Sequence, residues 1–400
     1  MTFKTGMETA AGRRQFQKAV LSWYRDHQRQ LPWRESADPY RIWVSEIMLQ
    51  QTTVAAVVPY FQRFTDRFPD VTSLATAEQD EVLRYWEGLG YYSRARNLHR
   101  AAQVIVDEHD GEIPSDAAKL QSLPGIGRYT AGAISSFAFK KPAPILEANT
   151  IRLYSRLMNL DLDPKTSAAQ KLLWSFAELI VSPTEPADFN QAVMDLGSGV
   201  CRPQEPDCGS CPLKKWCGAF QAGSQARIPR ESQKAALSEI TEVSVVIQGP
   251  KGFLLRQRTE GEWWSGLWDF ARFRVSPESA QELFPRRPKS VQKRKLRSES
   301  RSQKSLFADD ADEFRFPATW QAELQSLAGL QVSRIRPLTE IRHTVTRYRI
   351  RLICFTGRVS HQRLPEDCPF RWFSEEDLRT LPLSKTGREQ AQLVLPQAHS

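Results

Sequence analysis

Four cysteines in one short stretch constrain the fold of this chain more than any other feature. Six, two and five residues separate them: Cys201, Cys208, Cys211 and Cys217. A short loop can turn four thiols at this spacing toward one centre, and three prolines within the stretch favour a loop with little regular structure. Zinc and an iron–sulfur cluster both accept four thiolates, so the ligand type leaves the metal open. Disulfide bonds are the alternative use of these cysteines.

The composition indicates a globular protein with room for two or three domains. Of the 400 residues, 40% are hydrophobic and 25% are charged. The sequence holds no run of about 20 apolar residues that could span a bilayer, and residues 1–16 lack the apolar core of a secretory signal. We therefore expect a cytoplasmic protein, of a bacterial, nucleoid-associated type. In that reducing compartment cysteines bind metals more often than they form disulfides.

The charge of the chain is consistent with a polyanionic partner. The formal net charge is +9, from 55 basic and 46 acidic residues. Contacts from Lys and Arg to phosphate supply much of the affinity of proteins for nucleic acid. Mildly basic proteins are also simply soluble, so the charge alone leaves both interpretations open.

The apolar pattern divides the chain into two domains. Residues 12–227 show helical periodicity, with amphipathic runs at 40–51, 80–88, 94–108, 117–123, 129–139 and 168–180. Asp38 and Pro39 predict the start of the first run. Residues 228–239 are predicted as a linker. The domain at 240–385 contains strand-like segments at 240–247, 268–275, 347–355 and 370–373. We expect a mainly α N-terminal region and an α/β C-terminal domain.

A basic segment interrupts the second domain at about residues 276–312. Its central part, 285–304, holds nine basic residues and one acidic residue, Glu299, and has no apolar periodicity. This composition predicts a disordered insertion. The insertion could tether DNA or be only a solvated loop.

A glycine-rich turn lies between two of the predicted helices. Gly125 and Gly127 belong to the string Leu-Pro-Gly-Ile-Gly-Arg-Tyr-Thr-Ala-Gly-Ala at residues 123–133. Glycines permit the positive φ of a tight turn, and a helix that starts there exposes backbone N–H groups that can bind a phosphate oxygen. The full string resembles the helix-hairpin-helix of the DNA glycosylase superfamily.

The resemblance extends over most of the chain. The cysteine spacing is similar to the iron–sulfur loop of the endonuclease III and MutY glycosylases, and residues 15–220 resemble the catalytic region of the MutY adenine glycosylases. The matching strings are Leu-Pro-Trp-Arg at 31–34, Ser-Glu-Ile-Met-Leu-Gln-Gln-Thr at 45–52, Gly-Leu-Gly-Tyr-Tyr at 88–92 and Phe-Asn-Gln-Ala-Val-Met-Asp-Leu-Gly at 189–197. This resemblance implies a 4Fe–4S cluster on the four cysteines.

The region after residue 240 resembles, less closely, the C-terminal domain of the same family. That domain has a Nudix-like fold. The region here lacks a Gly-x5-Glu-x7-Arg-Glu box, so we expect no pyrophosphate hydrolysis.

The resemblance also implies two catalytic carboxylates. Glu46 matches the glutamate that protonates adenine N7, and it lies on an apolar helix face where burial would raise its pKa. Spacing alone favours the alternative that Glu46 caps a loop or pairs with an arginine, and the resemblance favours catalysis. Glu147 and Ala148 replace the aspartate and glycine of the family's Leu-Asp-Gly-Asn string, so the carboxylate that stabilises the sugar cation is one methylene longer here. Asn149 matches the residue that helps to position the nucleophilic water.

Tyr129 stands where bifunctional relatives carry a lysine. That lysine forms a Schiff base with the sugar, which tyrosine cannot do, so we expect little or no lyase activity. Tyr129 is instead expected to hydrogen-bond the second carboxylate or the sugar.

The same resemblance implies which residues contact the target base. A base in duplex DNA must be flipped out before its glycosidic bond can be reached. Gln51 and Tyr91 match residues that wedge into the base stack, and Trp33 and Arg34 match residues that line the adenine pocket. On their own, each could be an ordinary surface or core residue.

The partner base of the family is 8-oxoguanine, recognised partly by a Phe-Ser-His loop of the C-terminal domain. The equivalent string here is Ile341-Arg342-His343. Arg342 and His343 are therefore candidate contacts to the lesion or a neighbouring phosphate.

The sequence thus predicts a monomeric, monofunctional glycosylase that removes adenine mispaired with 8-oxoguanine or guanine in double-stranded DNA. Two alternatives stay open. One is a related glycosylase for another mismatched or oxidised base. The other is a catalytically weak lesion-binding protein in which Glu147 impairs the site, and assays of base release distinguish it from an active enzyme.

Overall fold

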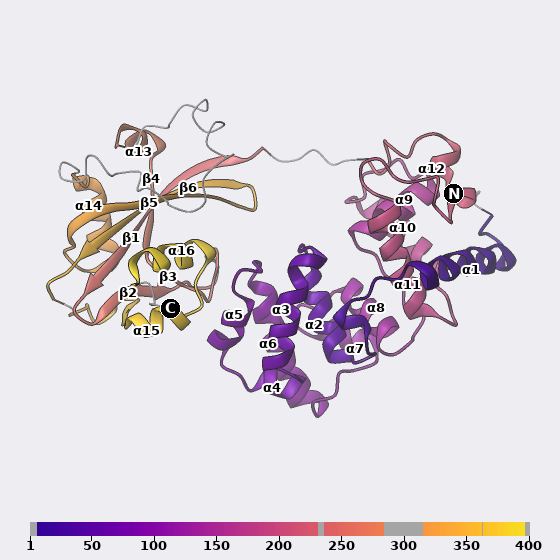
Figure 1. The fold of residues 1–400 in the computed structure, drawn as a ribbon, viewed down its shortest axis with the longest axis horizontal. Coiled ribbons are helices and arrows are strands. Elements are labelled where there is room, and N and C mark those ends of the chain that lie inside the picture. The colour runs from indigo at the N-terminus through magenta and orange to yellow at the C-terminus, as the bar shows by residue number, and fades with distance from the viewer. Residues whose placement is uncertain (1–5, 231–235, 284–314, 362, 397–400) are drawn as a thin grey trace. The chain divides into compact units, whose positions relative to one another are not determined.

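The computed structural model describes residues 6–230, 236–283, 315–361 and 363–396. The chain divides into two compact units, residues 1–85 with 94–234, and residues 86–93 with 235–400. The first unit is helical, and the second is built on a sheet with helices (Figure 1). Within the described parts of the chain, no helix is both long and apolar enough to cross a membrane.

The helices of the first unit follow one another along the chain, and the cysteine loop precedes the last of them. They are α1 (Ala10–His27), α2 (Pro39–Leu49), α3 (Val54–Arg67), α4 (Val71–Ala75), α5 (Gln79–Trp86), α6 (Ser93–His109), α7 (Ala117–Ser122), α8 (Arg128–Phe137), α9 (Ala148–Met158), α10 (Ser167–Ile180), α11 (Pro186–Asp195) and α12 (Gly218–Gln221). A π-helical turn, Leu196–Val200, continues α11. The amphipathic runs predicted from the sequence all fall on helices, namely α2, α5, α6, α7, α8 and α10.

Helix α2 begins where the sequence predicts. The carboxylate of Asp38 accepts a hydrogen bond of 2.8 Å from the backbone N–H of Tyr40, and Pro39 occupies the first turn. The helix packs against α3 and α8, and Trp43 and Met48 are fully buried. Because α2 lies in the core, packing on several sides fixes the direction of its polar side chains.

The first unit extends beyond its predicted boundary at residue 227. Ile228 is buried, and its carbonyl oxygen accepts a hydrogen bond of 2.8 Å from Nε of Arg156. At the other end of the predicted linker, Ser238 already pairs with Tyr348 in the sheet. The linker 228–239 was therefore predicted too long, because a buried arginine holds one end and strand pairing the other. Residues 231–235 lie outside the described residues.

A mixed sheet forms the second unit. Its strands are β1 (Ser238–Gly249), β2 (Gly252–Gln257), β3 (Trp268–Asp269), β4 (Ala271–Val275), β5 (Ser333–Val345), β6 (Tyr348–Arg358) and β7 (Phe370–Phe373). Their order is β3-β2-β1-β6-β5, with β4 also paired to β1 and β7 to β2. Strands β1 and β6 are parallel, and the other pairs are antiparallel. This arrangement confirms the α/β fold predicted for the C-terminal domain.

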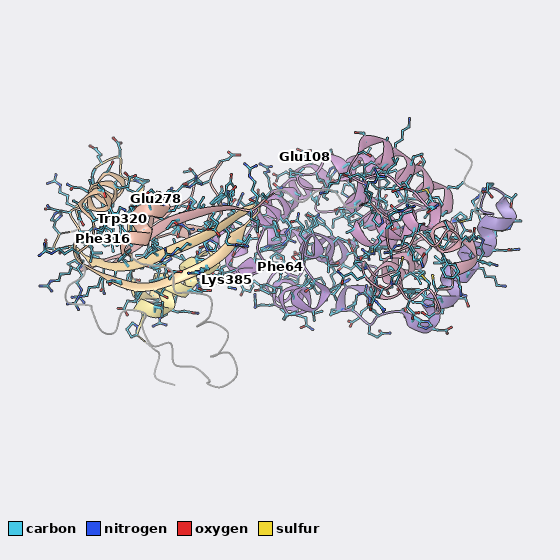
Figure 2. The ribbon with its side chains drawn as sticks, turned by 90° about the horizontal axis from the view of Figure 1, so that it is seen from above. Phe64, Glu108, Glu278, Phe316, Trp320 and Lys385 are labelled. Carbon is cyan, nitrogen blue, oxygen red and sulfur yellow. The ribbon has the colours of Figure 1, made fainter. Side chains whose placement is uncertain are left out.

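One face of the sheet packs against α14 (Ala318–Ala328). Val243 and Val245 of β1 share a core with Trp320 of this helix. Phe316, just before α14, lies beside Trp320 (Figure 2), with the ring centroids 5.8 Å apart. Because side chains alternate along a strand, Val243 and Val245 of β1 both point to this face of the sheet.

The opposite face packs against α15 (Glu375–Thr380) and α16 (Lys385–Val394). Val246 of β1 belongs to this second core, together with Leu378 of α15 and Ala391 of α16. Because α16 buries Ala391, the domain continues past the predicted end at residue 385.

Helix α13 (Pro277–Leu283) corrects the predicted start of the basic insertion. Ala280 on this helix is buried in the same core as α14. Residues 277–283 are therefore folded, because one apolar side chain anchors them to the sheet. The rest of the predicted insertion, from residue 284 to 312, lies outside the described residues.

Candidate active site

Glu46 is a buried carboxyl group in the last turn of α2. Its residue is only 3% exposed. Burial raises its pKa to about 7, and the nearby charge of Glu147 adds to the rise, while Tyr129 and Arg34 oppose it. Close to neutral pH this carboxyl group therefore carries a proton in a large fraction of molecules.

Tyr129 is the hydrogen-bond partner of Glu46. It is the second residue of α8, and its hydroxyl donates a bond of 2.6 Å to Oε2 of Glu46. Burial and the two nearby carboxylates raise the pKa of Tyr129 well above its ordinary value, so the phenol keeps its proton. Tyr129 was expected to bind the second carboxylate or the sugar. Its hydroxyl binds the first carboxylate and not the second, because α8 packs directly on α2, and the contact with the sugar stays a prediction.

The carboxylate of Glu147 caps the N-terminus of α9. Its two carboxylate oxygens accept hydrogen bonds of 2.9 Å from the backbone N–H groups of Asn149 and Thr150. The hydroxyl of Thr150 accepts in return from the backbone N–H of Glu147 at 2.8 Å, which completes a capping box. Burial raises the pKa of Glu147, and these two N–H groups oppose the rise. The extra methylene of glutamate is thus accommodated within the capping turn.

Asn149 connects this carboxylate to an arginine that the sequence analysis did not single out. The side-chain amide of Asn149 donates to Glu147 at 3.2 Å, and its oxygen accepts a bond of 2.9 Å from Arg152. Nε of Arg152 donates to the carbonyl oxygen of Cys201 at 2.7 Å. A continuous series of hydrogen bonds therefore runs from the first cysteine of the loop to the second carboxylate.

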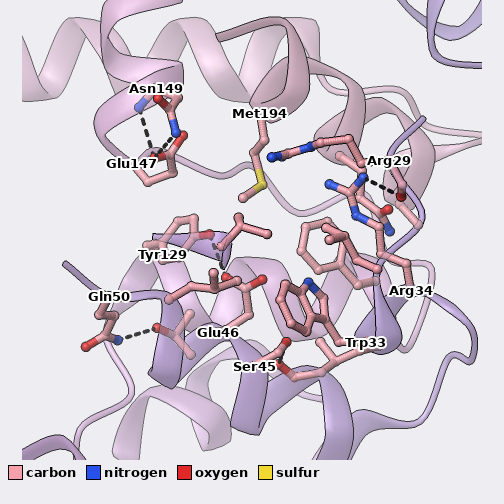
Figure 3. Close-up of a pocket in the computed structure, with 18 of the residues that line it drawn as sticks. Arg29, Trp33, Arg34, Ser45, Glu46, Gln50, Tyr129, Glu147, Asn149 and Met194 are labelled. Atoms are coloured by element: carbon pink, nitrogen blue, oxygen red, sulfur yellow. Dashed lines mark hydrogen bonds between the residues drawn. The ribbon is translucent and has the colours of Figure 1, made fainter. Parts of the chain in front are cut away.

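A cavity of about 980 Å³ brings these groups together (Figure 3). Tyr129 lies between Glu46 and Glu147 in this view. Of the residues predicted from the sequence, those that line the cavity are Trp33, Arg34, Glu46, Gln51, Gly127, Tyr129, Glu147 and Asn149. Its volume is large enough for a base-sized ligand.

Trp33 lines the cavity and also packs in the core. The residue is buried, and its ring meets that of Phe61 edge-on, with centroids 5.3 Å apart. Trp33 is therefore a core residue that also lines the cavity, and its contact with adenine stays a prediction.

Arg34 is held in the cavity by Asp195, a residue that the sequence analysis did not single out as functional. The guanidinium donates to both carboxylate oxygens of Asp195, at 2.8 and 3.1 Å. Arg29, which also lines the cavity, binds the same carboxylate. Burial alone would raise the pKa of Asp195, but Arg34 and Arg29 hold it below its usual range. One buried aspartate therefore fixes two cationic side chains at the wall of the cavity.

Two residues predicted to enter the base stack have left-handed backbones. Gln51 has φ 60° and lines the cavity, whereas Tyr91 has φ 49°, does not line it, and is 53% exposed. Left-handed backbone is uncommon for residues other than glycine and persists where neighbouring contacts enforce it.

The glycine-rich turn joins α7 to α8, as predicted. Gly125 has φ 77°, and a Cβ added there would lie 2.7 Å from Cβ of Asn97. Gly127 is the N-cap of α8 and has open space around its α carbon. Gly125 is therefore required by both conformation and packing, and Gly127 leaves the start of α8 accessible to a ligand.

The four cysteines of the loop line one small cavity. They are free thiols that border it together with Arg156 and Lys214. Arg156 donates to Sγ of Cys201 at 3.3 Å and to the carbonyl oxygens of Arg202 and Pro203. Cys354 and Cys368, in the second unit, have no part in this group.

Zinc and an iron–sulfur cluster both take four thiolates. Among the described residues, no three His, Cys, Asp or Glu side chains are grouped so as to hold one metal ion. A tetrahedral zinc would bring its thiolates to about 3.8 Å from each other, since each Zn–S bond is about 2.3 Å. The corners of an iron–sulfur cube hold their thiolates farther apart. The cavity brings together the four thiols that either group would require, with Arg156 against Cys201.

The candidate lesion contacts lie on β5 and differ in exposure. The Arg342 side chain is 54% exposed, and its Nε donates to Glu340 at 2.7 Å. The ring nitrogens of His343 are covered and have no hydrogen-bond partner among the described residues. Burial and then the charge of Arg272 lower the pKa of His343 to about 4. The ring of Trp264 lies beside His343, with the centroids 5.8 Å apart, and the expected contact of His343 to the lesion stays a prediction.

Both units match known families. Residues 44–178 match the HhH-GPD superfamily base excision DNA repair proteins, and residues 242–391 match the NUDIX domain. The first range contains Glu46, Tyr129 and Glu147, and the second runs from β1 into α16.

Named relatives cover more of the chain. It is 33% identical to the adenine DNA glycosylase of Homo sapiens over 428 residues, which cover 92% of this chain and 72% of that protein. It is 38% identical to the adenine DNA glycosylase of Buchnera aphidicola subsp. Acyrthosiphon pisum over 265 residues, 66% of this chain and 76% of that protein. The match to the Rattus norvegicus enzyme is 44% identical over 222 residues, 53% of this chain, but spans only 43% of that protein. By its sequence and by both of its units, this chain belongs to the MutY family of adenine DNA glycosylases.

Proposed function

We propose that this protein hydrolyses the N-glycosidic bond of adenine mispaired with 8-oxoguanine or guanine in double-stranded DNA, as a step of base excision repair. The observation that carries the proposal is the burial of Glu46 together with the raised pKa of its carboxyl group. This carboxyl group is buried, has a pKa of about 7, and lies in a cavity that a second carboxyl group, Glu147, also lines. Such a pair provides an acid for the leaving base and a charge for the sugar.

The first half of the reaction removes the base. Glu46, in its protonated form, donates its proton to N7 of adenine. The bond between N9 and C1′ then breaks with its electron pair moving to N9, so adenine leaves as a neutral tautomer. The sugar becomes an oxocarbenium-like cation, which the negative charge of Glu147 stabilises. The hydroxyl of Tyr129 keeps the Glu46 carboxyl group in the orientation needed for this transfer.

The second half adds water to the sugar. A water molecule held by Asn149 attacks C1′ and loses a proton to the carboxylate of Glu46, which restores the acid. The product is an abasic site. Because Tyr129 has no amine, no Schiff base forms at that position, and the enzyme has little or no lyase activity.

The wall of the cavity fits the flipped adenine. Trp33 supplies an aromatic surface, and Arg34, fixed by Asp195, supplies donors for ring nitrogens of the base. Gln51 and Tyr91 would fill the space that the base leaves in the stack, and the open start of α8 at Gly127 would bind a backbone phosphate. In the second unit, the exposed Arg342 is the group available to the partner base.

The four cysteines would hold the 4Fe–4S cluster. When bound, the cluster cross-links four points of the loop and supplies a compact negative centre. Arg156 and Lys214 border the cavity and offset that charge. Iron and sulfide analysis, with the visible absorption of the purified protein, tests this part of the proposal. A colourless, zinc-loaded protein prepared without oxygen would contradict it.

Single-turnover adenine release tests the main proposal. Duplexes would carry adenine opposite 8-oxoguanine, guanine or thymine, with wild type and Glu46→Gln compared on each. We expect faster release from the 8-oxoguanine and guanine pairs, and a loss of about 100-fold or more in Glu46→Gln, because one general acid contributes at least that much.

Two results would overturn the proposal. Wild-type rates in Glu46→Gln would remove Glu46 from the mechanism. Tight binding of all three duplexes without release of any base, in protein with its full complement of iron, would indicate a lesion-binding protein instead.

A further inference from the structure

The side chain of Arg94, the second residue of α6, is buried within the helical unit. Its residue is 8% exposed. One terminal nitrogen donates to the carbonyl oxygens of Ile47 and Met48, each at 2.8 Å, and to that of Gln50 at 2.5 Å. The other terminal nitrogen donates to the hydroxyl of Thr52 at 3.3 Å.

These contacts lie at the C-terminal end of α2. The last carbonyl groups of a helix have no partner within the helix, and a positive charge there also matches the helix dipole. Arg94 therefore completes the end of the helix that carries Glu46. A guanidinium can do so because its donors spread in a planar fork, which a lysine ammonium cannot reproduce.

The turn that Arg94 holds contains Gln51. Both neighbours of Gln51 in the chain, Gln50 and Thr52, are bound to the same guanidinium. Thr52 also donates from its hydroxyl to the carbonyl oxygen of Gln50 at 3.4 Å, and from its backbone N–H to that of Leu49 at 3.2 Å. Gln51 itself has a φ of 60°. A left-handed glutamine persists only where its surroundings enforce it, and here the residues on both sides are fixed.

We propose that Arg94 is a positioning residue that holds the Gln50–Thr52 turn so that Gln51 stays in its left-handed conformation at the base cavity. Gln50, Gln51 and Thr52 all line that cavity. Arg94 acts through this turn and does not itself line the cavity. The inference rests on the proposed function, in which Gln51 fills the stack while adenine is turned outward.

Base flipping can be measured separately from catalysis. The full-length Glu46→Gln protein, which keeps the base attached, would be bound to a duplex with 2-aminopurine in place of the target adenine opposite 8-oxoguanine. Fluorescence of 2-aminopurine rises when it leaves the stack. We expect Arg94→Lys to lower the equilibrium constant for flipping about tenfold, since a small displacement of a positioning contact has large effects.

A second substitution separates positioning from general stability. In Gln51→Gly, glycine adopts positive φ without help and has no side chain to present. We expect flipping to be lower in this variant, and adding Arg94→Lys to it should lower flipping less than twofold further. If Arg94→Lys caused the same loss with Gln51 intact as it does in the Gln51→Gly background, the proposal would be overturned. Normal flipping in Arg94→Lys alone would overturn it as well.

A milder variant covers the case in which Arg94→Lys does not fold. Thr52→Val removes the hydroxyl that binds both Arg94 and Gln50 but keeps the shape of the side chain. We expect about a threefold loss of flipping, with a thermal midpoint near that of the parent. Unchanged flipping in Thr52→Val would contradict the proposal. The failure of the proposed function would look different, because the Glu46→Gln parent would then give no fluorescence change at all.

Discussion

The hydroxyl of Tyr129 donates a hydrogen bond of 2.6 Å to Oε2 of Glu46. This bond favours the ionised carboxylate, whereas burial favours the protonated form and raises the pKa to about 7. The protonation of the candidate acid therefore depends on the balance between the surrounding apolar core and one phenol.

Tyr129→Phe should disturb this balance in a defined direction. Without the bond, the pKa of Glu46 rises further, so the alkaline fall in the rate of adenine release moves to higher pH. The maximal rate drops about tenfold because the carboxyl group loses its orientation. Single-turnover rates from pH 5 to 9 measure both effects.

Tyr40→Phe is the matched control for this change. Tyr40 donates its hydroxyl to the carbonyl oxygen of Phe68 and does not line the cavity. Its loss should lower stability and leave the pH profile unchanged. An unshifted profile in Tyr129→Phe would mean that the bond does not govern Glu46.

Glu46→Gln should stabilise the protein at alkaline pH. The pKa of Glu46 is about 7 in the folded chain and has an ordinary value of 4.5. Because the folded pKa is the higher one, stability is greatest below pH 4.5 and is lost as pH rises through 7. The loss is on the order of 3 kcal/mol. Denaturation midpoints for wild type and Glu46→Gln should therefore diverge between pH 5 and 8.5, with the variant higher.

Glu178→Gln provides the comparison for that measurement. Glu178 is paired with Arg128, and its side chain is 52% exposed. Removing one partner of this exposed ion pair should give only a small difference from wild type. If Glu46→Gln behaved in the same way, the Glu46 carboxyl group would not be protonated in the folded protein at neutral pH.

Glu147→Asp should remain active. Aspartate is a better N-cap than glutamate and can reach the same N–H groups of Asn149 and Thr150. We expect adenine release within about threefold of wild type, and an N-cap change worth up to ~1 kcal/mol of stability. Glu147→Gln, which keeps the length but removes the charge, should lose about 100-fold, since the sugar cation then lacks its counter-charge. Full activity of the glutamine variant would exclude Glu147 from catalysis.

Gly197→Ala should disturb the active site, although Gly197 does not line the cavity. A Cβ at Gly197 would lie 2.8 Å from the carbonyl oxygen of Asn149, within a rigid part of the backbone. The clash should cost about 1–3 kcal/mol of stability and displace Asn149, which lowers adenine release. Gly199→Ala, in the same π-helical turn, meets no atom within 4 Å and should be nearly neutral. Similar rates for the two variants would contradict this account.

Local sequence patterns predicted the elements that carry the chemistry. Asp38 and Pro39 marked the start of α2, and the apolar face of that helix indicated that Glu46 is buried. Gly125 and Gly127 marked the turn before α8. Each of these features depends on residues within a few positions of one another, so it can be predicted from the sequence alone.

Long-range contacts could not be predicted in this way. Arg94, Arg152 and Asp195 resemble surface residues in the sequence, yet each binds groups about 40 or more residues distant. Strand β5 was missed because its burial is only partial and its pairing with β6 has two register shifts near Pro337. For His343, the covering ring of Trp264 comes from a separate loop, with centroids 5.8 Å apart.

The π-helical turn Leu196–Val200 joins Asp195, which holds the cavity arginines, to Cys201, the first cysteine of the loop. A π turn contains one residue more than an α turn. Such a turn accommodates its extra residue locally, so the chain that follows keeps its direction although the connection is one residue longer than an α turn. Cys201 follows this turn directly, and its backbone N–H donates to the carbonyl oxygen of Leu196 at 2.7 Å. The wider turn therefore ties the start of the cysteine loop to the end of the helix that carries Asp195, so the cavity arginines and the first cysteine are held by one continuous piece of backbone.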